Sequence, residues 1–306
     1  MESKARWKNG LKIGYQTGNR VVLNGRKSSW TEVLSRVPQG SVLGPILFTI
    51  FINDLDSAAE LATILRKFAD ETKLGKVLNT PTAHMELQNT LEALEKWSEK
   101  WCMALNVQKC KVMHVGRTNT RSDYKMGGHV LEKTEEEIDI GVMVTPTLKP
   151  ATQCSKAAKT ATTVLGQISR AFHYRDRTTF LRLYKQYVRP HLEFSSQAWR
   201  PWLKKDVEIL EKVQERAVRM IGGLQGQTYQ KKLTELGLQS VEERMLEADL
   251  LMAYKVLHGM CKVDSASWFS MASLTANRST RATADPLRLL KPRTRQDIRS
   301  YQIFIQ

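Results

Sequence analysis

Hydrophobic positions in the first third of the chain predict short strands joined by turns. Residues 20–23 are mostly apolar and precede Asn24-Gly25, a strong signal for a two-residue hairpin turn. Residues 62–68 are apolar apart from two cations, and residues 73–78 follow an acidic tetrapeptide. A strand, an acidic turn and a second strand are therefore expected there.

Helical spacing dominates the remaining sequence. The apolar positions between 42 and 51 surround most of a helix, which predicts a largely buried helix capped by Ser41. Residues 84–105 carry apolar side chains on one helical face and charges on the other, as expected of a helix that lies on a sheet. The other expected elements are strands at 112–116 and 138–144 and helices at 151–173, 177–190, 204–222, 228–236 and 240–258.

These elements predict an α+β fold. Residues 1–150 are expected to form a small, mostly antiparallel sheet with packed helices, and residues 151–275 a mostly helical region. Residues 276–306 are rich in Arg, Ser, Thr and Pro, so a basic, poorly ordered tail is expected at that end.

The chain carries a formal net charge of +16, distributed unevenly. Residues 1–40 hold 8 Lys and Arg against 2 Asp and Glu, residues 41–150 hold 13 against 15, and residues 151–306 hold 26 against 14. A nearly neutral centre between basic flanks suits a polyanionic partner such as nucleic acid. A basic, well-solvated surface without a partner is the simpler alternative.

The four cysteines lie far apart in the sequence, without a C-x-x-C pair or histidines at zinc-site spacing. They are therefore expected to be reduced thiols of an intracellular protein. No apolar run reaches the roughly 18–20 residues of a membrane span. The charged first residues also lack the apolar core of a signal peptide.

The first segment with possible chemistry is Pro38-Gln39-Gly40-Ser41. Glycine allows the backbone to approach a ligand closely, and the start of a helix offers unpaired N–H groups to phosphate or sugar. Taken alone, however, such a segment is usually just the start of a helix.

The second segment covers residues 68–71 and contains the adjacent acids Asp70 and Glu71. Two carboxylates on a turn between strands can hold a divalent metal against a triphosphate, although acidic pairs on surface turns are far more common. A third segment places Lys109 and Lys111 before an expected strand. By itself it indicates only a solvated surface.

In this order and spacing, the three segments resemble the palm of the reverse transcriptases of non-LTR (LINE-type) retrotransposons. VPQGSVLGPILFTIFINDL from residue 37 is similar to motif B of that family, KFADETKL from residue 67 to motif C, and LEKWSEKWCMALNVQKCKVMHVGR from residue 94 to motif D. The similarity continues through LRLYKQYVRPHLEF, LEKVQERA and Leu236-Gly237-Leu238, and covers roughly residues 5 to 300. Residues 1–150 would then form a partial palm, and residues 151–275 a thumb-like and C-terminal region.

The resemblance implies RNA-templated DNA synthesis by two-metal nucleotidyl transfer, with Mg²⁺ as the metal, RNA as template and DNA as primer. It implies that Asp70 is a metal-binding catalytic carboxylate and that Glu71 takes the place of its acidic partner. The other implied contacts are Pro38, Gln39, Gly40 and Ser41 with nucleotide and template, Phe68 with the primer end, and Lys109 or Lys111 with the leaving pyrophosphate. Because such elements copy themselves at nuclear DNA, a location in the nucleus or cytoplasm is expected.

The chain also departs from the family pattern. The family's first catalytic aspartate lies in a D-x-x-x-A-F-D motif, and these 306 residues contain no such motif. The first residues already resemble the segment that follows it, so an N-terminally truncated domain without fingers or endonuclease is expected. Glu71 replaces an aspartate and Arg36 a glycine, and Mg²⁺ tolerates little deviation from octahedral geometry at about 2.0–2.1 Å. We therefore expect a polypeptide that is inactive on its own.

Three interpretations remain open from the sequence. The first is a LINE-type reverse transcriptase domain that is inactive alone, and the second is a residual, non-specific RNA- or DNA-binding protein without catalysis. In the second, four aromatic residues are candidates for base stacking, although such residues more often belong to a core: Tyr184, Tyr187, Trp199 and Trp202. The third is an unstable polypeptide, because a palm without one strand exposes a sheet edge and apolar faces.

Overall fold

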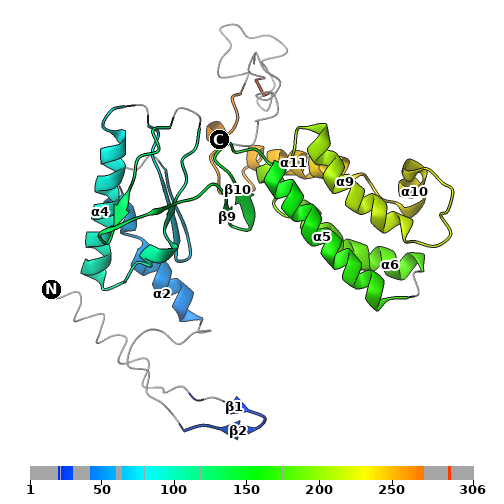
Figure 1. Cartoon of the computed structure of the whole chain (residues 1–306), viewed down its shortest axis with the longest axis horizontal. Coiled ribbons are helices and arrows are strands. Elements are labelled where there is room, and N and C mark those ends of the chain that lie inside the picture. Colours follow the sequence, from blue (N-terminus) through cyan, green and yellow to red (C-terminus); the bar gives the residue numbers. More distant parts are fainter. Residues whose placement is uncertain are drawn as a thin grey trace. The chain divides into compact units, whose positions relative to one another are not determined.

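The computed structural model describes residues 20, 22–29, 42–59, 64–78, 80–116, 119–173, 176–271 and 289–290. Their fold is α+β, as predicted, and the strands form five separate two-stranded sheets. The chain divides into two compact units, one of residues 1–112 with 120–132 and one of residues 113–119 with 133–306 (Figure 1). Apart from Leu289 and Leu290, the expected tail lies outside the described residues.

The first unit contains two main helices and several hairpins. In chain order its elements are β1 (Val22–Leu23), β2 (Arg26–Lys27), α2 (Leu43–Ile52), α3 (Leu55–Ala58), β3 (Ile64–Phe68), β4 (Glu71–Gly75), α4 (Ala83–Trp101), the 3-10 turn η1 (Val107–Lys109), β5 (Lys111–Val112), β6 (Lys125–Met126), β7 (His129–Val130) and β8 (Glu132–Lys133). Asn24 and Gly25 join β1 to β2 with φ of 50° and 78°. Positive φ at both turn residues is typical of Asn-Gly hairpins, so this prediction is confirmed.

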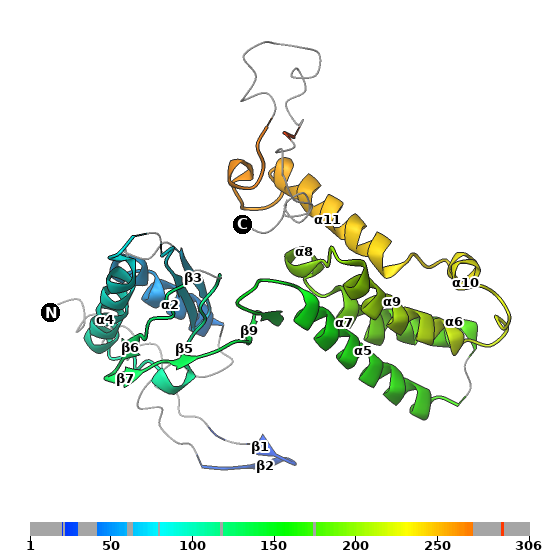
Figure 2. The same ribbon diagram turned by 45° about the horizontal axis from the view of Figure 1, so that its top comes forward.

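The apolar face of α4 holds the first unit together. Leu94 and Trp97 of α4 pack with Ile52 and Leu55, and Leu74 of β4 joins the same cluster. Leu74 also packs against a second cluster, which contains Leu91, Tyr124, Met126 and Leu131. The predicted helix at 84–105 therefore forms and lies against strands, with α2 beside it (Figure 2).

Helix α2 is not largely buried, which corrects the prediction. Phe48, Phe51 and Ile52 pack toward α4, whereas Ile46 and Ile50 are each 53% exposed. Within the part of the chain that the structure describes, only one face of this all-round apolar helix is covered. The opposite face leaves large apolar side chains in contact with solvent.

Residues 138–144 form a hairpin in place of the single strand that was predicted. β9 (Glu137–Asp139) pairs antiparallel with β10 (Val142–Val144) through the turn Ile140-Gly141, where φ is 43° and 84°. Two positive φ values are typical of a type I′ turn. The signal is weak in the sequence because a β-branched residue such as Ile140 rarely adopts a positive φ.

The second unit is mostly helical, as predicted. Its helices are α5 (Ala151–Ala171), α6 (Arg177–Leu183), the π-helical turn η2 (Tyr184–Val188), α7 (Arg189–Glu193), α8 (Ser196–Trp199), α9 (Lys204–Arg219), α10 (Tyr229–Leu236), α11 (Val241–Leu257) and the 3-10 turn η3 (Ser265–Ser267). α5 runs alongside α7 and α9 (Figure 2). It contributes Ala157, Ala161 and Leu165 to a core that includes Leu210 of α9 and Met245 of α11.

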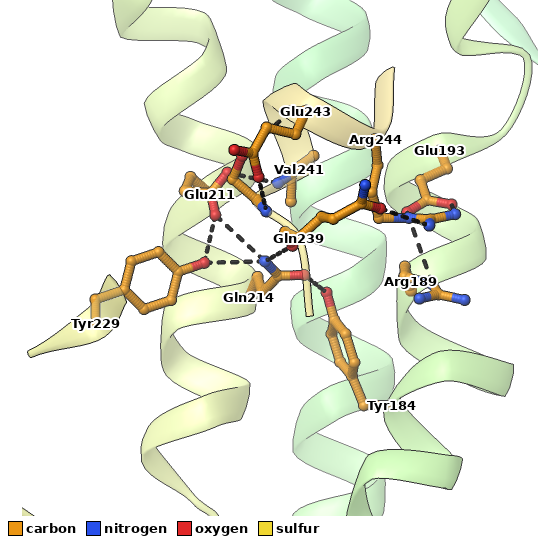
Figure 3. Close-up of polar contacts among 11 residues, drawn as sticks. Tyr184, Arg189, Glu193, Glu211, Gln214, Tyr229, Gln239, Val241, Glu243 and Arg244 are labelled. Carbon is orange, nitrogen blue, oxygen red and sulfur yellow. Dashed lines mark hydrogen bonds and ion pairs between the residues drawn. The ribbon is translucent and has the colours of Figure 1, made fainter. Parts of the chain in front are cut away.

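A buried network of polar side chains links the helices of this unit (Figure 3). The side chain of Gln214 accepts a hydrogen bond from the Tyr184 hydroxyl at 2.6 Å. Its amide nitrogen donates to the Tyr229 hydroxyl at 3.0 Å and to the backbone carbonyl of Gln239 at 2.9 Å. Gln214 on α9 thereby connects the π-helical turn, α10 and the residues that lead into α11.

Two glutamates extend the network to α11. Glu211 accepts from the Tyr229 hydroxyl and, at 2.8 Å, from the backbone N–H of Val241. Glu193 of α7 accepts two hydrogen bonds from the guanidinium of Arg244, the longer at 2.9 Å. Burial raises the pKa of Tyr184 and of Tyr229 well above the usual range, so both hydroxyls keep their protons and act as donors.

The substitution Tyr184→Phe is expected to destabilise the second unit by about 1–3 kcal/mol, because it leaves the buried amide oxygen of Gln214 without its donor. Urea denaturation followed by circular dichroism measures this loss. Tyr187→Phe is the matched control on the same π-helical turn, where the side chain is 55% exposed and an effect below about 0.5 kcal/mol is expected. Equal effects of the two substitutions would contradict a structural role for the Tyr184 hydroxyl.

Candidate metal and nucleotide site

The predicted metal-binding turn lies at the tip of the β3–β4 hairpin. The strands pair in register up to Phe68 and Glu71, so Ala69 and Asp70 form a two-residue turn. Ala69 has a φ of 51°, a left-handed conformation that costs a residue other than glycine about 1–2 kcal/mol. A positive φ is what a two-residue hairpin turn requires, so this strain follows from the short connection between the strands.

Asp70 and Glu71 are both exposed at this tip. Carboxylate oxygens are the ligands that Mg²⁺ prefers, so the chemistry of these donors fits a divalent cation. Among the described residues, no group of three or more His, Cys, Asp and Glu side chains is arranged to hold a metal ion. The turn therefore offers two carboxylates, which is fewer ligands than a complete site requires.

The two faces of the hairpin have different surroundings. On one face Leu65 pairs with Leu74, which packs into the clusters around α4. On the other face Ile64 and Phe68 are 48% and 59% exposed, with Arg66 exposed between them. The open face thus combines apolar and cationic side chains next to the two carboxylates.

Lys67 ties the strand before the turn to the end of α2. Its ammonium donates to the carbonyl of Ile52 at 3.0 Å and to that of Asn53 at 3.4 Å. It also lies 2.7 Å from Oδ1 of Asp56. Because the carbonyls at a helix C-terminus carry partial negative charge, a cation is favourable there. The segment that resembles motif C is therefore fixed to the helix of motif B.

Trp97 of α4 fixes the same corner. Its indole N–H donates to Oδ1 of Asp54 at 3.0 Å. Phe51 of α2 meets the rings of Trp97 and Trp101 edge-on, with centroid distances of 5.9 and 5.4 Å. The elements that resemble motifs B, C and D thus form one packed group. The sequence did not predict these structural roles of Lys67, Asp54 and Trp97. It shows only that the three residues lie within the segments that resemble motifs C, B and D.

The structure shows less about the other residues that were predicted to contact nucleotide or template. Lys109 ends η1 and Lys111 begins β5, and both are exposed. The strand predicted at 112–116 is reduced to β5, which ends at Val112. The segment Pro38-Gln39-Gly40-Ser41 and Arg36 lie outside the described residues.

The aromatic residues considered for base stacking differ in exposure. Tyr184 and Trp199 are core residues, as the more common alternative predicted. Trp202 is partly buried, and Tyr187 is exposed on the π-helical turn. Only Tyr187 among these four presents a largely open ring.

The sequence profile of the family described as "Reverse transcriptase (RNA-dependent DNA polymerase)" matches residues 2–168, which is more than half of the chain. The chain belongs to the reverse transcriptase family. Its LINE-type character, predicted from motifs B to D, is confirmed together with the family. Reverse transcriptases depend in general on divalent metal ions and bind a nucleic acid template and primer.

Curated relatives of this reverse transcriptase domain agree with the family. The RNA-directed DNA polymerase from mobile element jockey is 24% identical over 66% of the chain in Drosophila melanogaster and 27% identical over 66% in Drosophila funebris. The probable RNA-directed DNA polymerase from transposon BS of Drosophila melanogaster is 26% identical over 68% of the chain. The chain spans only 23–25% of the length of these relatives.

No solved structure matches the chain significantly. The four cysteines of this reverse transcriptase domain form no disulfide with one another. Among the helices that the structure describes, none combines the length and the apolar character needed to cross a bilayer.

The substitution Lys67→Met is expected to weaken the attachment of the β3–β4 hairpin to α2 by about 1–2 kcal/mol, because it removes two hydrogen bonds to carbonyls and one ion pair. Hydrogen exchange of the amides in Ile64–Phe68 and Glu71–Gly75 should then be about 5- to 30-fold faster. Asp56→Asn is the matched control, since it removes only a partly exposed ion pair, and a change below about threefold is expected. Unchanged exchange in the Lys67 variant would contradict this role.

Proposed function

We propose that residues 1–150, which include the first unit, are the part of a LINE-type reverse transcriptase palm that carries motifs B to D, and that residues 151–275 within the second unit are its thumb-like region. The proposed boundaries are residues 1–150 for the partial palm, 151–275 for the helical region and 276–306 for a basic tail. The packing of α2, α4 and the β3–β4 hairpin, whose tip carries Asp70 and Glu71, is the observation that supports this proposal most strongly. The activity that the domain serves is RNA-templated DNA synthesis.

In this proposal the residues of the chain position the reactants. Asp70 and Glu71 hold Mg²⁺, which when bound neutralises charge on the triphosphate of the incoming nucleotide. Phe68, exposed on the open face of the hairpin, lies beside the primer end. The other proposed contacts are Pro38, Gln39, Gly40 and Ser41 with nucleotide and template, and Lys109 or Lys111 with the leaving pyrophosphate.

The 306 residues alone are proposed not to extend a primer. They contain no D-x-x-x-A-F-D motif, and the described residues around the turn bring no third carboxylate to Asp70 and Glu71. The uncovered side chains of Ile46 and Ile50 on α2 support a palm whose packing continues beyond the described residues. A carboxylate supplied from outside this sequence would be needed to complete the metal site.

Non-specific binding of RNA or DNA without catalysis is the second candidate function. It is favoured by the charge of residues 151–306, which carry 26 Lys and Arg against 14 Asp and Glu. Cations on this region neutralise phosphates, and the exposed Tyr187 offers a ring to an unpaired base. Both proposals place the protein in the nucleus or the cytoplasm.

Both proposals require the chain to bind nucleic acid. This is tested by measuring the affinity of the purified chain for a fluorescent RNA–DNA primer–template over a salt series. Because released counterions weaken binding, about 6 phosphate contacts predict a loss of affinity of about 10³-fold between roughly 50 and 200 mM salt. Asp70→Ala is the matched variant and should bind equally, since it removes one carboxylate and no cation. Affinity that is independent of salt would contradict both proposals.

Addition of nucleotides and Mg²⁺ to the same samples separates polymerase from binding protein. No extension above the Asp70→Ala level is expected from the 306 residues alone. Extension is expected when the chain is preceded by a reverse transcriptase segment that carries the D-x-x-x-A-F-D strand, and Asp70→Ala should abolish it. Extension by the isolated chain would show that other carboxylates complete the site, and failure of the extended chain would leave only the binding function.

A further inference from the structure

Helix α11 has two apolar faces, and only one is used inside the second unit. Val241 and Met245 belong to the core of the second unit, and Val256 is also buried. On the other side, Leu246, Leu250, Leu251 and Tyr254 are between 46% and 62% exposed and line a shallow groove together with Glu243 and Glu247. A cluster of large apolar side chains in this setting is typical of an interaction surface.

The charges on the exposed side of α11 are segregated along the helix. Glu242, Glu243 and Glu247 lie in the first half, whereas Lys255 and His258 lie in or just after the second half, and all are exposed. His258 stacks on Tyr254 with a ring-centroid distance of 4.1 Å, so both rings share the exposed side. Apart from Arg244, which pairs with Glu193 of α7, this side of the helix is therefore acidic at one end and basic at the other, with leucines between them.

Two copies of α11 that run antiparallel place the acidic half of each helix beside the basic half of the other. In an antiparallel pair with a two-fold axis between Leu250 and Leu251, a residue before the axis meets the one that is equally far beyond it on the other helix. Glu243 then lies opposite His258 of the second copy, and Glu247 lies opposite Tyr254, one residue from Lys255. Leu250 meets Leu251 of the second copy at the centre.

We propose that the exposed face of α11 is a self-association surface on which a second copy of this chain docks antiparallel. A parallel arrangement would place acidic ends together, so the charges select the antiparallel one. Helix α11 has 17 residues and is about 25 Å long. A single pair of such helices buries less than the ~1,200 Å² of a standard stable interface, so the dimer is weak and depends on concentration.

Sedimentation velocity of the full chain from about 1 to about 200 micromolar tests the proposal. The weight-average mass is expected to rise from one protomer toward two across this range. Leu250→Glu should abolish the rise, because it places a charge from each copy at the centre of the apolar contact. Leu148→Glu is the matched control, since Leu148 is 50% exposed elsewhere in the second unit and its variant should dimerise like the original chain.

A charge exchange distinguishes this pairing from non-specific apolar association. Glu247→Lys alone should weaken the dimer by about tenfold, and adding Lys255→Glu to the same chain should restore it. A chain that stays monomeric to the highest concentration would overturn the proposal and indicate that another segment or protein covers the face. Association that resists Leu250→Glu, or that the second substitution does not restore, would overturn it as well.

Discussion

The first unit depends on the packing of the tryptophan-bearing face of α4 against α2 and the β3–β4 hairpin. Trp97 joins this packing through its ring, which contacts Phe51, and through its N–H, which bonds Asp54. Lys67 adds the hairpin to the same corner through the last carbonyls of α2. An apolar cluster and a few directional bonds therefore fix the position of the Asp70 turn.

The second unit is stabilised in a different way. A broad apolar core is crossed by a polar network centred on Gln214, which is fully buried. Because an unpaired buried amide is costly, the network specifies one arrangement of the π-helical turn, α9, α10 and α11. None of the Lys and Arg side chains that the structure describes within residues 151–271 is buried in this core. The same helices thus combine a specific interior with a basic exterior.

Local sequence signals predicted most elements but few of the contacts that position the site. The Asn24-Gly25 hairpin and the helices after residue 150 follow from turn chemistry and 3.6-residue spacing. The hairpin at Ile140 was missed because its turn residue is one that turns normally avoid. The partners of Lys67 and Gln214 could not be predicted, since they are distant in sequence and only tertiary packing brings them together. The metal and nucleotide roles rest on the family resemblance.

The most direct test of a metal-binding role for the Asp70 turn is nuclear magnetic resonance of the isotope-labelled full chain titrated with Mn²⁺. Two carboxylates on one turn should bind this ion weakly and locally. Paramagnetic broadening is therefore expected at the amides of residues 69–72 and is expected to disappear in Asp70→Ala. Broadening confined to other acidic positions, or unchanged by Asp70→Ala, would contradict a metal-binding role for this turn.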